Sequence, residues 1–170
     1  MKTFLLSILL IIVLSSTSLF SQCYECTGQE TTNTITYSVP QVGCGQCEYT
    51  VTYKQCSTSS SILIESIESS ASNPVCCQGT AINDPMVSGY ILDEAANQIA
   101  LVVGGTLTIY TPSKCWKWEG HLGPNGIHTA VLVTCSFNIS CCVYVYENGN
   151  LTSHTTKGAE VCNECMPLCE

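Results

Sequence analysis

Cysteine is the residue type with the widest chemistry in this chain of 170 residues, which contains fourteen of them. The spacing Cys23-x2-Cys26, seventeen residues, Cys44-x2-Cys47 falls within the range of zinc sites built from four thiolates. The second pair also has the outline of a thiol–disulfide exchange motif, but the strand-like residues after it offer no helix N-terminus to lower a thiol pKa. Zinc binding and thiol redox chemistry are therefore the alternatives to structural disulfides.

The N-terminal residues favour the disulfides. Lys2 precedes an apolar stretch at residues 4–14, and a polar run rich in serine follows, which is typical of a signal peptide. The stretch is about half of the ~20 residues that span a bilayer, so we expect cleavage and no membrane anchor. Residues 1–21 are the predicted signal peptide, and residues 22–170 form the predicted secreted, extracellular chain. Export places the thiols in an oxidising compartment, and no metal or cofactor is expected.

The positions of the cysteines constrain their pairing. Seven lie before and seven lie after a cysteine-free stretch at residues 78–114. If all pair within one chain, an odd number on each side requires at least one bridge across that stretch; one free or intermolecular thiol in each half, giving a covalent dimer, is the alternative. Neighbouring residues on a strand point to opposite faces, so each member of a vicinal pair should have a different partner. The disulfide candidates are Cys23, Cys26, Cys44, Cys47, Cys56, Cys76, Cys77, Cys115, Cys135, Cys141, Cys142, Cys162, Cys165 and Cys169.

Alternating and β-branched residues predict that short strands position these cysteines. The predicted strands are residues 34–38, 48–53, 62–67 and 130–137, together with two hairpins, 98–103 with 106–110 around Gly104-Gly105 and 143–146 with 151–155 around Asn148-Gly149. Residues 84–98 have a helix start at Asp84 and Pro85, but Gly89 weakens the pattern, and we expect only a short helical turn at 94–97.

The predicted fold is all-β: a small disulfide-rich secreted domain of short antiparallel strands and hairpins, sandwich-like or irregular, with little helix. We expect residues 22–170 to form a single domain. Two cysteine-rich halves, 22–80 and 112–170, joined by a cysteine-free β segment, are the alternative.

Two tryptophans are the candidate ligand platform. Trp116 and Trp118 would share one face of a strand with Lys117 opposite, and paired indoles suit stacking against sugar rings. The competing interpretation makes both tryptophans core residues packed on the Cys115 bridge. Tyr144 and Tyr146 alternate in the same way and are expected to form a packed face.

Charge and motif content restrict the function further. The chain has no arginine, and its five lysines oppose thirteen acidic residues, so a nucleic-acid partner is excluded. The sequence has no Gly-x-Ser-x-Gly elbow, no Gly-rich phosphate loop after a strand and no histidine near its two aspartates, and we expect no enzyme. Asn138 and Asn150 begin acceptor sequons for N-glycosylation, which predicts a glycoprotein.

These observations predict a secreted, disulfide-stabilised extracellular binding or structural protein that recognises a protein or glycan partner. The alternative is a secreted inhibitor or toxin-like effector that presents the loop between Cys115 and Cys135, which contains Gly120, Gly123, Pro124 and Gly126. A zinc-binding or thiol-redox protein is the third hypothesis.

Overall fold

The computed structural model describes eight stretches of the chain: residues 23–41, 45–70, 85–111, 113, 115–122, 128–134, 140–158 and 166–167. The predicted signal peptide lies outside them. So do half of the cysteines and one sequon, namely Cys44, Cys76, Cys77, Cys135, Cys162, Cys165, Cys169 and Asn138.

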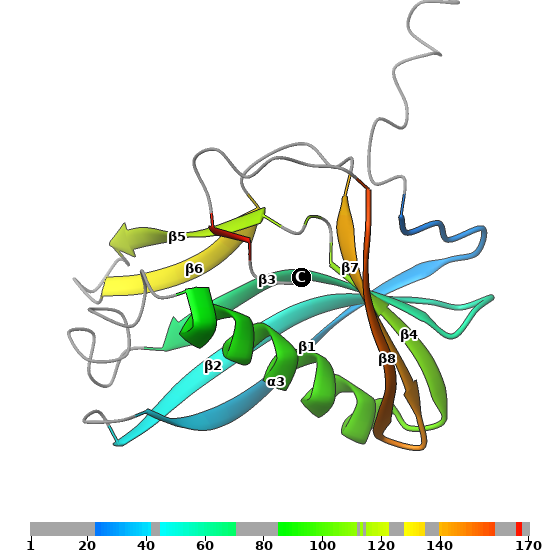
Figure 1. Ribbon diagram of the computed structural model, residues 1–170, viewed down its shortest axis with the longest axis horizontal. Helices are drawn as coiled ribbons and strands as arrows, with labels where there is room; N and C mark the ends of the chain where they lie inside the picture. The colour runs from blue at the N-terminus through cyan, green and yellow to red at the C-terminus, as the bar shows by residue number, and fades with distance from the viewer. Residues whose placement is uncertain are drawn as a thin grey trace, which may run out of the picture.

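Within these stretches, nine strands form one mixed sheet, and a long helix lies against it (Figure 1). The elements are β1 (Glu30–Gln41), β2 (Gly45–Cys56), β3 (Ser61–Ser70), α3 (Pro85–Val103), β4 (Thr106–Tyr110), β5 (Cys115–Leu122), β6 (His128–Thr134), β7 (Cys141–Glu147), β8 (Asn150–Lys157) and β9 (Met166–Pro167). The predicted predominance of β structure is confirmed.

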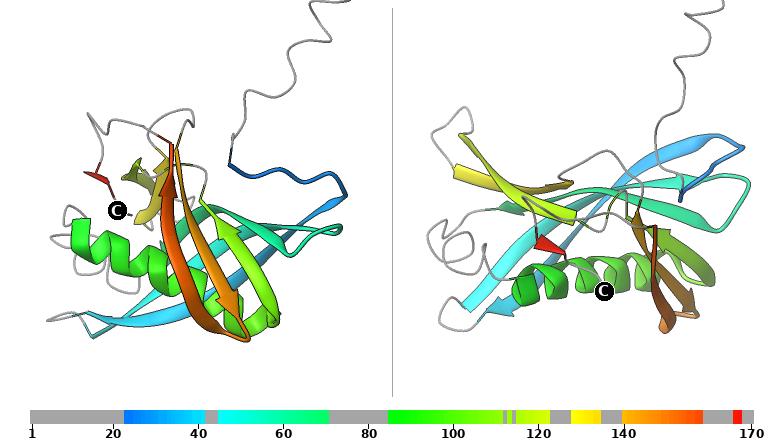
Figure 2. Two further views of the ribbon diagram at one scale, coloured as in Figure 1. Left: turned by 45° about the vertical axis from the view of Figure 1, so that its right-hand side comes forward. Right: turned by 45° about the horizontal axis from the view of Figure 1, so that its top comes forward.

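The sheet branches at β3. One edge of β3 pairs with β2, and β2 pairs in turn with β1. The other edge is shared, because Ser61 to Leu63 pair in parallel with β4 whereas Ile67 to Ser69 pair antiparallel with β6. The β4–β7–β8 arm and the β5–β6 arm therefore leave β3 in different directions, as Figures 1 and 2 show.

Helix α3 connects the parallel strands β3 and β4, which is the crossover that such a pair requires. It packs against β1, β3 and β8, and Figure 2 shows it lying along one face of the β1–β2–β3 layer. Its sheet-facing side is apolar and small, so the helix approaches the sheet closely. The buried residues of this side are Ile91, Leu92, Ala95, Ala96, Ile99 and Ala100.

The helix corrects one prediction. The first predicted hairpin is wrong, because residues 98–103 are the last turns of α3, and the expected helical turn at 94–97 is part of a helix of 19 residues. Gly104 and Gly105 have φ values of 72° and 74°, and the Gly104 N–H donates to the Ala100 carbonyl at 2.9 Å. A glycine pair with positive φ ends a helix as readily as it turns a hairpin.

The other strand predictions are confirmed. Residues 34–38, 48–53 and 62–67 lie in β1, β2 and β3, and the second predicted hairpin is β7–β8, whose turn residues Asn148 and Gly149 have φ values of 52° and 79°. Strand β6 ends at Thr134, and residues 135–137 lie outside the described part.

Buried tyrosines join the helix to the sheet. The Tyr37 hydroxyl donates to the Ile91 carbonyl at 2.7 Å, and the Tyr144 hydroxyl donates to the Asp93 carboxylate at 3.0 Å. Burial, reinforced by neighbouring groups, raises the pKa of both hydroxyls well above the usual range. Each neutral phenol therefore fills core volume and also fixes the position of α3 along the sheet.

Candidate functional site

The two tryptophans of the predicted platform differ in their exposure to solvent. Trp116 is completely buried, and its indole N–H donates to the Ser113 carbonyl at 2.7 Å. Trp118 is partly buried against the core, and its indole N–H donates to the Ser88 hydroxyl of α3 at 3.0 Å. Lys117 points to the opposite face, as predicted, and forms an ion pair with Glu119 at 2.7 Å. Trp116 is a core side chain, so the platform interpretation is wrong for this residue. Trp118 is only partly buried at the edge of the core, and its part in a ligand platform stays a prediction.

The observed disulfides bear on the three predictions for the cysteines, namely structural disulfides, zinc binding and thiol redox chemistry. Cys23 is bonded to Cys141, and Cys26 is bonded to Cys56. The first bond crosses the cysteine-free stretch, as the odd counts required. Cys142 is disulfide-bonded too, so the vicinal residues Cys141 and Cys142 have different partners, also as predicted.

No cysteine in the described stretches is free, and Cys47 and Cys115 are likewise disulfide-bonded. Cys23 and Cys26 have sulfur partners on separate strands, so this pair does not present two thiolates to a zinc ion. No cluster of three or more His, Cys, Asp or Glu that could hold a metal occurs in the part of the chain that the structure covers.

The disulfides hold an N-terminal segment, residues 23–29, across the end of the sheet. The bond between Cys26 and Cys56 attaches it to the end of β2, and Ser57 then makes two hydrogen bonds with Gln29: the Ser57 N–H donates to the Gln29 carbonyl at 2.9 Å, and the Gln29 N–H donates to the Ser57 hydroxyl at 3.0 Å. The hydroxyls of Thr27 and Thr58 lie 3.4 Å apart. The β2–β3 turn, residues 57–60, is therefore fixed by a neighbouring segment as well as by its own strands.

Gly28 lies where this segment crosses the β2–β3 turn. A Cβ atom at Gly28 would lie 2.5 Å from Thr58 Cγ2 and 2.7 Å from the Ser57 hydroxyl. A residue with a Cβ at this position would force the Ser57 and Thr58 side chains to turn away, and the Ser57 hydroxyl is the group that accepts the hydrogen bond from Gln29. The position of the turn thus depends on a covalent bond, three hydrogen bonds and one glycine contact.

A groove of about 510 Å³ opens beside this fixed turn. The β2–β3 turn forms one side, the junction of α3 and β4 forms the opposite side, and the ends of β1 and β2 lie between them. The lining residues are Thr31, Gln55, Cys56, Ser57, Ser59, Ser60, Val103, Gly104, Gly105, Thr106 and Leu107. Five hydroxyl groups and one amide face two aliphatic side chains, and the described lining contains no charged side chain.

Bare backbone forms part of the α3–β4 side. A Cβ atom placed on Gly104 or Gly105 would meet nothing within 4 Å, so the peptide groups at this junction border open space. The Gly105 carbonyl accepts from the Asn148 N–H at 2.8 Å, which ties the junction to the β7–β8 turn. A ligand can approach this backbone closely, and the junction itself is held in place.

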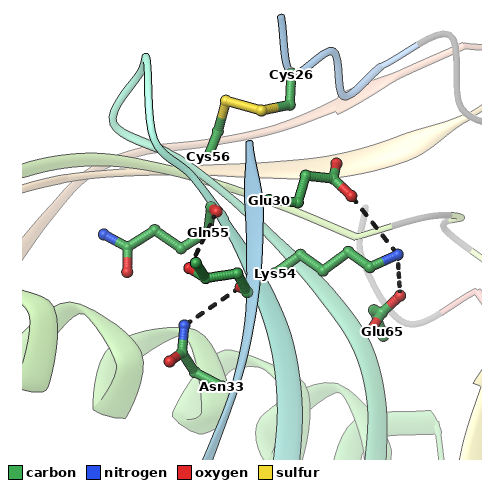
Figure 3. Close-up of polar contacts among 8 residues, drawn as sticks. Cys26, Glu30, Asn33, Lys54, Gln55, Cys56 and Glu65 are labelled. Carbon is green, nitrogen blue, oxygen red and sulfur yellow. Dashed lines mark hydrogen bonds and ion pairs between the residues drawn. A yellow bond between two sulfur atoms is a disulfide. The ribbon is translucent and has the colours of Figure 1, made fainter. Parts of the chain in front are cut away.

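A cluster of three charged side chains lies on the other side of the β1–β2 ladder, where one lysine is paired with two glutamates. Figure 3 shows Lys54 reaching towards Glu30 and Glu65, whereas Asn33 and Gln55 project in the opposite direction, on the side of α3. The Lys54 ammonium lies 2.7 Å from Glu65 and 3.8 Å from Glu30. The hydrogen bond to Glu65 raises the pKa of Lys54, so the ammonium stays charged and paired.

A second polar group connects α3 with the β4–β7–β8 arm. The His154 ring stacks on Tyr144, with centroids 4.3 Å apart and planes at 15°, and Tyr144 donates to Asp93. His154 Nε2 is buried and has no hydrogen-bond partner in the described stretches. No sequence motif assigns His154 a role, and its ring packs on Tyr144 beside the helix.

One predicted glycosylation site lies on the surface. Asn150 is exposed at the first position of β8, directly after the β7–β8 turn, and its amide donates to the Asn148 carbonyl at 3.3 Å. The other predicted site, Asn138, lies outside the described residues.

No local pattern in the sequence predicts the groove, although two of its segments are distinctive. The run Ser57-Thr58-Ser59-Ser60-Ser61 follows Cys56 directly, and the Gly104-Gly105 pair predicts a hairpin turn. Neither signal indicates by itself that the two segments meet.

Comparison of the sequence with protein-family models, with curated proteins and with solved structures finds no match. Within the stretches that the structure covers, no helix has the length and hydrophobicity needed to cross a membrane.

Proposed function

We propose that the protein is a secreted, disulfide-stabilised extracellular binding protein, and that the groove between the β2–β3 turn and the α3–β4 junction binds an uncharged glycan. The observation that carries the proposal is the lining of the groove, which combines hydroxyl and amide groups with bare backbone and contains no charged side chain among its described members.

The chemistry of the lining favours a carbohydrate. Serine and threonine hydroxyls and the Gln55 amide both donate and accept hydrogen bonds, and sugar hydroxyls do the same, so each partner satisfies the other. Val103 and Leu107 offer an aliphatic surface to the C–H face of a sugar ring. The groove has the size of ordinary small-ligand sites, which occupy roughly 300–1,000 Å³. A charged ligand would lose its hydration in the groove and would meet no side chain of opposite charge there, which is unfavourable.

The fixed geometry of the turn supports a binding role. Recognition through several weak hydrogen bonds requires donors and acceptors that are already in place, because ordering a flexible loop consumes much of the binding free energy. The disulfide between Cys26 and Cys56 and the two Ser57–Gln29 hydrogen bonds order the β2–β3 turn before any ligand arrives.

The predicted signal peptide and the disulfides support an extracellular location. Disulfide bonds persist in secreted proteins and are rare in the cytosol. We also propose that Asn150 carries an N-linked glycan, because its sequon is exposed beside a tight turn.

Screening of the oxidised protein against a panel of soluble neutral oligosaccharides, followed by titration calorimetry of the hits, tests the binding proposal. Ser59→Tyr places a bulky ring in the groove and should abolish binding. The matched control is Thr34→Tyr, which adds the same ring at an exposed position of β1 away from the groove lining. Equal binding by both variants, or no hit with any neutral sugar, would contradict the proposal.

A further inference from the structure

The end of the molecule that contains the groove also carries most of the large exposed apolar side chains. Leu101, Val102 and Leu151 are 59%, 66% and 51% exposed, and the only other large apolar residue so exposed in the described part is Tyr90, at 52%. Leu101 and Val102 belong to the last turn of α3, and Leu151 is the second residue of β8. We call these three residues the aliphatic rim.

The aliphatic rim adjoins the groove. Val102 directly precedes Val103, which lines the groove, and the next two residues are the groove glycines. On the far side of this helix end, Leu101 Cδ2 lies 3.3 Å from the position that a Cβ on Gly149 would occupy, so Leu101 packs against the β7–β8 turn that precedes Leu151. The hydrogen bond between Asn148 and Gly105 joins the β7–β8 turn to the α3–β4 junction. Groove and aliphatic rim thus meet at the C-terminal end of α3.

This adjacency narrows the ligand class. A groove lined by hydroxyl groups and no charged side chain matches a sugar. Exposure of the adjoining aliphatic side chains to water is unfavourable, so this surface matches hydrocarbon. The chain has a net charge of −8 and no arginine, so electrostatic attraction to anionic lipid headgroups is absent. The ligand that matches both parts is a lipid with a neutral sugar headgroup.

We propose that the protein binds neutral glycolipids at a membrane surface, with the sugar in the groove and the aliphatic rim in contact with the acyl region of the bilayer. This inference rests on the proposed glycan-binding function and extends it to a class of ligand. Membrane binding of a peripheral protein grows with the apolar area that it buries, and stable attachment takes two signals, which the sugar contact and the aliphatic rim would supply together.

The extent of the rim argues against a second copy of the chain as the occupant. Stable protein interfaces bury roughly 800 Å² on each partner, and three aliphatic side chains form only a small part of such an area. A bilayer needs no matching surface, so a few side chains are sufficient to contribute to membrane binding.

Vesicle co-sedimentation of the oxidised, full secreted chain tests the proposal. Phosphatidylcholine vesicles containing a minor fraction of glucosylceramide or galactosylceramide should bind the protein, whereas phosphatidylcholine alone and phosphatidylcholine with phosphatidylserine should not. The double variant Leu101→Ser/Val102→Ser should bind the glycolipid vesicles at least about tenfold more weakly, because each change removes an aliphatic side chain from hydrocarbon contact. Binding of the soluble headgroup sugar should be unchanged.

Tyr90→Ser is the matched control, because Tyr90 is similarly exposed on α3 but lies near the opposite end of the helix from the rim. Its vesicle binding should equal that of the native chain.

Native protein that binds soluble sugar but not glycolipid vesicles would overturn this inference and leave the proposed function intact. Failure to bind either would contradict the proposed function itself. Equal binding to vesicles without glycolipid, or a dimer that the double variant dissociates in light scattering, would also overturn the inference.

Discussion

Strand β5 and the β2–β3 turn are opposites in composition and in position. β5 carries two tryptophans, the largest side chains in the chain, and both indoles are directed into the core. The turn consists of three serines and a threonine, and all four are exposed. The residues that look most like a ligand platform therefore stabilise the fold, and the residues with the least distinctive side chains line the groove.

The difference reflects how each region is held in place. Burial of apolar surface positions β5, and Ser88 and Ser113 satisfy the indole N–H groups. The β2–β3 turn buries little, so a disulfide and hydrogen bonds from the N-terminal segment position it instead. A surface that is ordered by cross-links can remain polar and exposed, which is what a binding site for sugars requires. The following predictions test this division.

The largest effect is expected for Trp116→Ala. Removal of a fully buried indole should destabilise the protein by about 3–5 kcal/mol. Urea unfolding of the oxidised protein measures this change. Lys117→Ala, on the exposed face of the same strand, should change stability by no more than about 0.5 kcal/mol. Similar losses for both variants would show that β5 is not divided into a core face and a solvent face.

Removal of the disulfide between Cys26 and Cys56 should have the second largest effect. The double variant Cys26→Ser/Cys56→Ser opens a bridge between residues 30 positions apart and should cost about 2–4 kcal/mol. If the β2–β3 turn becomes mobile, hydrogen exchange at the Ser57 amide, which donates to the Gln29 carbonyl, should become faster. The Trp118 indole N–H, which donates to Ser88, should stay protected. Unchanged exchange at Ser57 would mean that hydrogen bonds alone fix the turn.

Local sequence patterns were sufficient to predict most of the strands. Alternation predicted the strand at residues 48–53, and Asn148-Gly149 predicted the β7–β8 turn, because both signals depend only on neighbouring residues. The odd cysteine counts also predicted a bridge like that between Cys23 and Cys141 if all cysteines pair within one chain, because this follows from counting alone.

Helix α3 and the groove were not predicted, because both depend on distant contacts. The last turns of α3 consist of apolar and β-branched residues before two glycines, a pattern shared by a strand and a turn; burial against β1 and β3 decides the outcome. The groove brings residues 55–60 together with residues 103–107 through the parallel pairing of β3 and β4. No local signal in the sequence encodes that pairing.

The same substitution, glycine to alanine, can be made in both regions and compares their packing. Gly28→Ala forces the exposed Ser57 and Thr58 side chains to turn away, which weakens the hydrogen bond that the Ser57 hydroxyl accepts from Gln29, and should destabilise the protein by about 1 kcal/mol. Gly120→Ala in β5 meets nothing within 4 Å, so its effect should stay within about 0.5 kcal/mol. Thermal or urea unfolding of the pair decides the matter. If Gly28→Ala were as neutral as Gly120→Ala, the N-terminal segment would not press on the β2–β3 turn.

The smallest effect is expected from the ionisation of Tyr24, which lies in the N-terminal segment and packs edge-on against Tyr110 at 5.8 Å. Burial and the neighbouring Glu30 carboxylate raise the pKa of Tyr24 from 10.0 to about 12. The phenol ionises more easily in the unfolded chain than in the folded one, so its contribution to stability is complete below pH 10 and is lost as the pH rises from 10 to about 12.

Tyr24→Phe removes this group and leaves the other buried tyrosines in place. The variant should therefore lose less stability than the native chain across that pH window, while the two should show a constant difference below it. Urea midpoints measured on both sides of pH 10 give the comparison. Parallel curves throughout would place the Tyr24 hydroxyl in free exchange with water, and the N-terminal segment would then be attached to the sheet by its disulfides without being packed onto it.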